Sequence, residues 1–246
     1  MDRMLYIAMT GAREAAHSQQ VNTHNLANAN TTGFRKSLEA FTNHPLRGPV
    51  YDSRDYAQLQ AVKADFTSGP QIATGRDLDV AVQGDGWIAV QAPDGGEAYT
   101  RAGNFQVNSV GLLTTGDGLP VLGEDGPLAI PPFESIEIGA DGTLSIRPLG
   151  QEANVLAEVG RVKLVNPDLQ ELARGEDGLF RRADGAVEPA DVNVSLASGM
   201  LEGSNVNTIE AMVNMIELAR NFETHVKLMK TAEDLDRSSS QLLRIS

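Results

Sequence analysis

The chain reads NLANANTTGF from Asn25 to Phe34, and this stretch ends its first predicted helix. Asn22, Asn25 and Asn28 follow one another at intervals of three, so their amides lie along one helix face. Asparagine is a mediocre helix former, but a row of amides fixes the register of packed helices, as a buried Asn does in coiled coils. Gly33 tolerates positive φ and ends the helix, and Phe34 follows as an apolar plug. A plain helix C-cap explains Gly33 but not the asparagine series.

The residues before this stretch predict a single helix with a narrow apolar face. Between Met4 and Asn28 there is no proline, and Gly11 is the one glycine. Small side chains let another helix approach closely but bury little area, so this helix is marginal alone. The 3-4 spacing that defines its face runs through Leu5, Ala8, Ala12, Ala15, Gln19, Asn22 and Leu26.

The other end of the chain predicts a longer helix with a wider apolar face. From Val206 to Leu243 there is neither Gly nor Pro, and Asn205 or Asn207 is placed to cap its start, with Glu210 completing a capping box. Two adjacent stripes are too wide for one partner helix. An ordinary two-helix core is the plain alternative, but no third helical pattern exists, so we expect other molecules to cover the second stripe. The stripes are Ile209, Met212, Ile216, Ala219 and Val226, and Met215, Leu218, Phe222 and Met229.

The middle of the chain predicts an antiparallel all-β domain, because short strand-like runs alternate with Asp-Gly dipeptides, a strong hairpin-turn signal. The predicted class is therefore α+β, with N- and C-terminal helices that pair in a coiled-coil-like manner. The predicted strands are 78–83, 87–91, 105–108, 136–139 and 159–165. We expect four regions: the N-terminal helix and its signature (1–35), an extended connector with a few short strands (36–75), the central β-domain (76–200) and the C-terminal helix (201–246).

Composition narrows the function classes. The formal net charge is −13, the opposite sign to that of a protein that binds nucleic acid by neutralising phosphates. The absence of cysteine excludes disulfides and thiolate chemistry. Aromatic residues make up only 5 % of the chain, so we expect an extended molecule or one that completes its buried surface against partners. No apolar run approaches the roughly 20 residues of a membrane span. We therefore expect no membrane insertion, and since the N-terminus lacks a secretory signal, any export would use a route without a cleaved leader.

Catalytic and metal-binding patterns are missing from the sequence. There is no dinucleotide fingerprint, phosphate-binding loop or nucleophile elbow. His17 and His24 are seven apart, but no acidic residue is spaced to complete a metal site. Asp77 and Asp79 are better explained as a polar strand edge than as a general acid–base pair. We therefore predict no enzyme activity, no cofactor and no metal.

Two terminal motifs and the β-rich middle together resemble the flagellar axial proteins, which are the rod, hook and hook-associated proteins. The resemblance covers the whole chain. The segment 220–223 resembles the family's Arg-x-Tyr-Glu, with Phe222 where Tyr is commoner. The matching motifs are Asn25–Phe34, Leu201–Val206 before the last helix, and Asp79–Trp87 with Tyr99–Phe105 in the middle domain.

Within this family, length argues against the larger hook protein and leaves one proximal-rod protein and the distal-rod protein FlgG. The connector after Phe34 is too short and unlike the one expected for FlgG. The features that favour the proximal-rod type are Val159–Val165, Asp177–Arg181 and the ending Gln241–Leu243.

The resemblance implies a structural subunit of the bacterial flagellar basal-body rod, located in the periplasm. Such a subunit polymerises through its terminal helices into the drive shaft that transmits torque from motor to hook. The implied partners are further copies of the chain, the rod proteins FlgB, FlgC and FlgG, and the flagellar type III export apparatus. The expected assembly interface is Asn22, Asn25, Leu26, Ala27, Asn28, Thr31, Gly33, Phe34, Glu202, Ser204, Asn205, Met212, Met215, Ile216, Phe222, Val226 and Met229.

A non-flagellar β-domain binding protein with oligomerising helices is the competing hypothesis, with cell-wall glycan as one ligand. Binding glycan requires an exposed aromatic platform, and the clustered candidates are Trp87, Tyr99 and Phe105. Packing in the core of the β-domain explains these three residues better.

Overall fold

The computed structural model describes residues 2–47, 52–150 and 156–245, and the chain forms two compact units. The helical unit consists of Met1–Ala29, Lys36–Asp65 and Val206–Ser246. The β unit consists of Asn30–Arg35 and Phe66–Asn205. Two terminal helices that pack together and a central antiparallel β region confirm the predicted α+β class.

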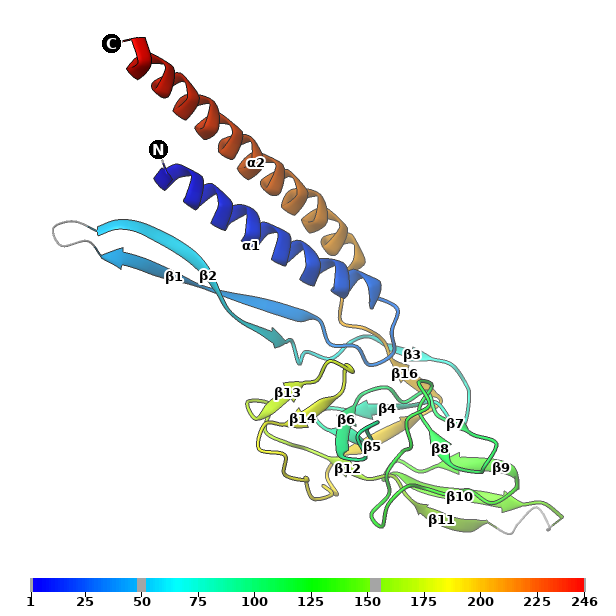
Figure 1. Cartoon of the computed structure of the whole chain (residues 1–246). Coiled ribbons are helices and arrows are strands. Elements are labelled where there is room, and N and C mark those ends of the chain that lie inside the picture. The colour runs from blue at the N-terminus through cyan, green and yellow to red at the C-terminus, as the bar shows by residue number, and fades with distance from the viewer. Residues whose placement is uncertain (1, 48–51, 151–155, 246) are drawn as a thin grey trace. The chain divides into compact units, whose positions relative to one another are not determined.

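Helices α1 (Asp2–Ala27) and α2 (Thr208–Ile245) lie side by side in the helical unit (Figure 1). They run antiparallel, because Asn22 Nδ2 donates to the Ala211 carbonyl at 2.7 Å while Gly11 faces His225 further along both helices. A Cβ at Gly11 would lie 2.3 Å from His225 Cε1, so glycine permits the close approach there. The N-cap of α2 is Asn207, whose Oδ1 accepts from the backbone N–H groups of Ile209 and Glu210.

A long hairpin completes the helical unit. Strands β1 (Ser37–Arg47) and β2 (Asp52–Ala64) pair antiparallel from Ser37↔Ala64 outward. Here the sequence predicts an extended connector with a few short strands, because Pro45 and the neighbouring glycine and prolines are typical breakers. Both strands of a two-stranded ribbon are edge strands, and an edge strand tolerates a proline that donates no hydrogen bond.

The β unit is built from short strands, all paired antiparallel, as the sequence predicts. The largest sheet has the order β12-β5-β6-β14-β13, and a second has the order β11-β10-β9. The two-stranded sheets are β15-β4, β16-β3 and β7-β8. The strands are β3 (Gln71–Ala73), β4 (Val80–Gln83), β5 (Trp87–Gln91), β6 (Glu97–Thr100), β7 (Gln106–Val107), β8 (Leu113–Thr114), β9 (Phe133–Ile138), β10 (Thr143–Pro148), β11 (Ala157–Arg161), β12 (Leu164–Val165), β13 (Leu172–Arg174), β14 (Phe180–Arg182), β15 (Ser195–Ser198) and β16 (Met200–Glu202).

The apolar core of the β unit lies between these sheets. Its fully buried members include Val80, Ile88, Leu113 and Leu144, which come from strands distant in the sequence, and Phe105, which directly precedes β7. Glycine is needed where backbone segments touch. At Gly103, for example, a Cβ would lie 1.8 Å from the Val80 carbonyl oxygen.

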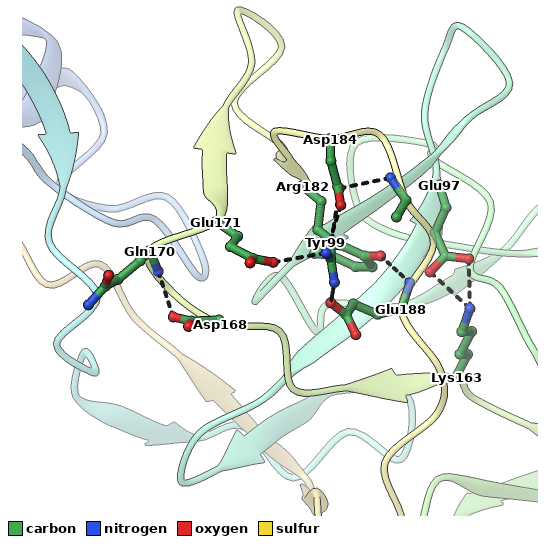
Figure 2. Close-up of polar contacts among 10 residues, drawn as sticks. Glu97, Tyr99, Lys163, Asp168, Gln170, Glu171, Arg182, Asp184 and Glu188 are labelled. Carbon is green, nitrogen blue, oxygen red and sulfur yellow. Dashed lines mark hydrogen bonds and ion pairs between the residues drawn. The ribbon is translucent and has the colours of Figure 1, made fainter.

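A polar network borders this core, as Figure 2 shows. The buried Tyr99 hydroxyl accepts a hydrogen bond from the Glu188 N–H at 2.9 Å. Lys163 Nζ bonds both carboxylate oxygens of Glu97. Arg182 pairs with three carboxylates, those of Glu171, Asp184 and Glu188. This arginine therefore ties together the loops on either side of β14.

We predict that Tyr99 makes stability fall at alkaline pH. Burial raises the pKa of Tyr99 from 10.0 to about 12. The native state therefore keeps this proton between about pH 10 and pH 12 while the unfolded chain loses it, and the free energy of unfolding decreases across that range. The expected decrease is roughly 2–3 kcal/mol. Urea unfolding of the natural chain and of Tyr99→Phe at a series of pH values measures it. Equal slopes against pH for the two proteins would contradict the prediction.

Candidate assembly surface and chain junction

One apolar stripe of α2 is open to solvent. Ile209, Met212 and Ile216 are 74 %, 54 % and 57 % exposed, and Val226 is also exposed. The other predicted stripe is less exposed, because Met215, Leu218 and Met229 are half-buried, although its member Phe222 is 38 % exposed. The face of α2 toward α1 is completed by Ala211, His225 and Ala232. The helix therefore satisfies one stripe within the subunit and leaves the other uncovered.

The first turns of α1 add exposed apolar side chains that the sequence analysis does not include in the interface. They are Met4, Leu5, Tyr6, Ile7 and Met9, all more than two-fifths exposed. The sequence does contain a pattern that could have revealed them. The helix begins with an almost unbroken run of large apolar residues, although the stripe that it buries consists mainly of alanines. Leu5 also lines a hollow with Val226 and Met229, which charged residues of α2 border.

The asparagines of the first signature use their amides inside the chain. Asn25 Nδ2 donates to the Ser37 carbonyl at 2.9 Å, and Asn25 Oδ1 accepts from the Ser37 N–H at 2.8 Å. Asn22 bonds α2, and Asn28 Nδ2 donates to the His24 carbonyl. Beside them Leu26 is half-buried and Ala27 is exposed. The asparagine row thus joins α1 to both α2 and the base of the hairpin.

The signature then enters the β unit. Thr31 is exposed, whereas Gly33, Phe34 and Arg35 are buried. The Gly33 N–H donates to the Glu202 carbonyl at 2.8 Å. Gly33 has φ of +69°, and a Cβ there would lie 2.3 Å from the Arg101 carbonyl carbon. Both the backbone conformation and the close packing therefore require glycine at this position.

The Glu202 carboxylate is the centre of this junction. Its Oε1 lies 2.6 Å from Arg35 Nη1 and accepts from the Gly69 N–H at 2.9 Å. Its Oε2 accepts from Arg101 Nη1 at 3.0 Å. All three charged side chains are almost completely buried. Burial lowers the pKa of Arg101, and the neighbouring Glu202 charge opposes that shift.

The rest of the C-terminal signature packs into the same junction. Ser204 is buried, and Asn205 is half-buried with its Nδ2 donating to the Thr67 carbonyl at 3.0 Å. The Asn205 N–H also bonds the Phe34 carbonyl. Sequence reasoning missed Arg35 and Arg101. Each follows or lies within a quoted motif, but nothing in the spacing of a charged residue shows that it is buried.

Other site types find little support in the described residues. Trp87, Tyr99 and Phe105 are fully buried, so they form no glycan-binding platform. Within residues 2–47, 52–150 and 156–245, no cluster of His, Asp or Glu side chains is arranged to hold a metal ion. The described helices include none with the length and apolarity needed to cross a membrane.

The fold and junction define a class of protein: a subunit whose two chain ends pair as helices, whose middle forms a β unit, and in which one apolar helix face is left open. Family comparisons agree with this class. Residues 5–35 match the family model "Flagella basal body rod protein", residues 81–146 match "Flagellar hook protein FlgE/F/G D1 domain", and residues 197–242 match "Flagellar basal body rod FlgEFG protein C-terminal".

Individual relatives narrow the family further. The flagellar basal-body rod protein FlgF of Escherichia coli (strain K12) is 44 % identical, with 100 % of both chains covered. FlgF of Caulobacter vibrioides is 33 % identical, covering 99 % of this chain and 98 % of the relative. FlgG of Bacillus subtilis is 32 % identical, covering 96 % and 97 %. The chain belongs to the flagellar basal-body rod proteins, and within them to the FlgF family. It is a structural subunit of the flagellar basal-body rod.

The junction predicts a contrast between two glycines with nearly the same backbone conformation. Gly33 and Gly75 have φ of +69° and +71°, but a Cβ at Gly75 meets nothing within 4 Å. Gly75→Ala should cost about 1 kcal/mol, which is the conformational penalty alone. Gly33→Ala should cost at least about 2 kcal/mol more, because backbone atoms of Arg101 must move. Urea unfolding followed by fluorescence of the single Trp87 measures both. Similar losses in the two variants would argue against tight packing at Gly33.

Proposed function

We propose that this rod subunit polymerises through the exposed apolar stripe of α2 and the first turns of α1. The observation that supports the proposal most directly is the stripe itself, Ile209, Met212, Ile216 and Val226, which no described part of the subunit covers. Removing such side chains from water contributes about 1.5–3 kcal/mol each. A stripe on one helix that meets a different surface on the next subunit is a heterologous contact, and such contacts build open helical polymers.

We propose an indirect role in assembly for the asparagines and the two signatures. Asn22 and Asn25 bond within the chain, so their contribution is to hold α1 against α2 and the hairpin in one register. Gly33, Phe34 and Glu202 are buried in the β unit. These residues present the stripe in a defined geometry, and the exposed residues Met212, Ile216, Phe222 and Val226 make the contacts between subunits.

The partners that this role implies are further copies of the chain and the neighbouring rod proteins FlgB, FlgC and FlgG. Delivery to the periplasm by the flagellar type III apparatus fits a chain whose first helix buries mostly alanines and is weakly stable alone. The role is mechanical and non-catalytic: the assembled rod carries torque from motor to hook. Relatives named as rod proteins support this assignment.

We predict that polar substitution of the stripe stops assembly without unfolding the subunit. Met212→Gln with Ile216→Gln keeps good helix formers on an exposed face, so the free energy of unfolding should change by less than about 1 kcal/mol. Rod completion should fail because the contact between subunits loses its apolar area. Electron microscopy of isolated basal bodies and spreading in soft agar measure the effect in cells.

The matched control replaces two exposed valines of the β unit. Val187 and Val192 are 61 % and 77 % exposed, and Val187→Gln with Val192→Gln should leave rods and swimming intact. Normal rods in the stripe variant would refute the proposed assembly surface.

A further inference from the structure

The chain passes between the helical unit and the β unit four times, and every passage lies beside the Glu202 junction. The passages are at 29–30, 35–36, 65–66 and 205–206. Each passage lies within three residues of Glu202 itself or of a residue that contacts Glu202. In chain order these residues are Gly33, Arg35, Gly69 and Glu202. Glu202 thus contacts or carries all the chain segments that link the two units, through its carboxylate at Arg35 and Gly69 and through its backbone carbonyl at Gly33.

The junction is also tied to the core of the β unit. Arg101 bonds Glu202 through Nη1 and donates through Nη2 to the Gly84 carbonyl at 2.9 Å, directly after β4. The Arg101 guanidinium carbon lies 5.3 Å from the centre of the Trp87 ring at the start of β5. A continuous set of polar contacts therefore leads from the linking segments into the central strands.

Arg35 carries the argument, because charge balance does not need it. Arg101 and Glu202 form a neutral pair without it, and burying a further cation has a desolvation cost that an apolar residue would avoid. The Arg35 side chain is nevertheless fully buried, 2.6 Å from the carboxylate, and the Arg174 Nη1 donates to the Arg35 carbonyl. Residues 30–35, called the strap below, link two parts of the helical unit through the β unit. The buried charge of Arg35 is explained if its contact with Glu202 holds this strap in place.

We infer that Arg35, Arg101 and Glu202 form a clasp that makes the four linking segments bear load together. The inference rests on the proposed function, because it assumes that torque enters the subunit through the terminal helices. With the clasp closed, tension on any linking segment passes through Glu202 and Arg101 to the core. With Arg35 released, the strap of residues 30–35 can peel from the β unit while the other segments remain bound.

The test removes Arg35 and keeps the neutral pair. Arg35→Met is close in size and leaves the Arg101–Glu202 contact, so the β unit should fold. In the purified full-length protein, amide hydrogen exchange at Gly33 and Asn205 should accelerate at least tenfold, while exchange in β5 stays unchanged. Arg35→Lys, which keeps the charge, should restore slow exchange. If Arg35 served only to fill space, the Met variant would exchange as slowly as the Lys variant.

The control is Arg182→Met. Arg182 also pairs with carboxylates in the β unit, but Glu171, Asp184 and Glu188 are far in sequence from every linking segment (Figure 2). Its loss should leave exchange at Gly33 and Asn205 unchanged. Unchanged exchange in Arg35→Met would overturn the clasp.

In cells, Arg35→Met should assemble rods in normal number but lose motility under load. The fraction of swimming cells should fall at least twofold more steeply with medium viscosity than for Arg182→Met. Equal viscosity dependence, or absence of rods, would overturn the load-bearing role. Normal rods in the Met212/Ile216 variant would instead refute the proposed assembly surface, whatever the exchange result.

Discussion

The rest of this structure depends on one buried carboxylate, Glu202, held between two buried guanidinium groups. Taking three charges out of water costs several kcal/mol for each ion, and Glu202 offsets that cost by pairing with both arginines. The two arginines would otherwise repel each other beside Trp87, with their guanidinium carbons 5.9 Å and 5.3 Å from its ring centre. The cluster therefore demands that residues 30–35 and residues 202–205, from opposite ends of the chain, reach the β unit together. Glycine makes this approach possible, since a Cβ at Gly69 would lie 2.1 Å from the Gly203 carbonyl oxygen.

The helical unit is subject to a different constraint. Its two helices must pack together within the subunit and still leave apolar side chains exposed. Alanines and Gly11 on α1 let α2 approach closely, and the ring of His225 fills the space above Gly11. This pairing uses one stripe of α2 and leaves the stripe from Ile209 to Val226 exposed. A contact through a few such side chains contributes several kcal/mol, comparable to the freedom lost when two subunits associate. The proposed stripe contact with a single neighbour is then insufficient, so the proposal implies several neighbours around each subunit.

Much of the fold follows from patterns that a sequence displays. Both helices are visible as long segments without proline, and β5 is predicted residue for residue from Trp87 to Gln91. The predicted strand over 159–165 is in fact two strands. β11 pairs with β10 up to Arg161, and β12 pairs with β5 from Leu164. Alternation of apolar and polar residues does not show such a change of sheet. The hairpin was missed because Pro45 and its neighbours outweigh the strand signal locally. Arg35 and Arg101 were missed because a buried charge is fixed by distant partners, and periodicity reports only apolar faces.

The strong negative charge of the subunit opposes its self-association. A net charge of −13 keeps separate subunits apart and soluble, because like charges repel over distances up to the Debye length, about 8 Å at physiological salt. Beyond that range the repulsion is screened, and at contact the apolar residues of the stripe must offset it. Two free subunits gain one apolar contact against this repulsion, whereas a subunit joining an existing rod end gains several at once. On the proposed stripe contact, growth from an existing rod end is therefore favoured over association of free subunits.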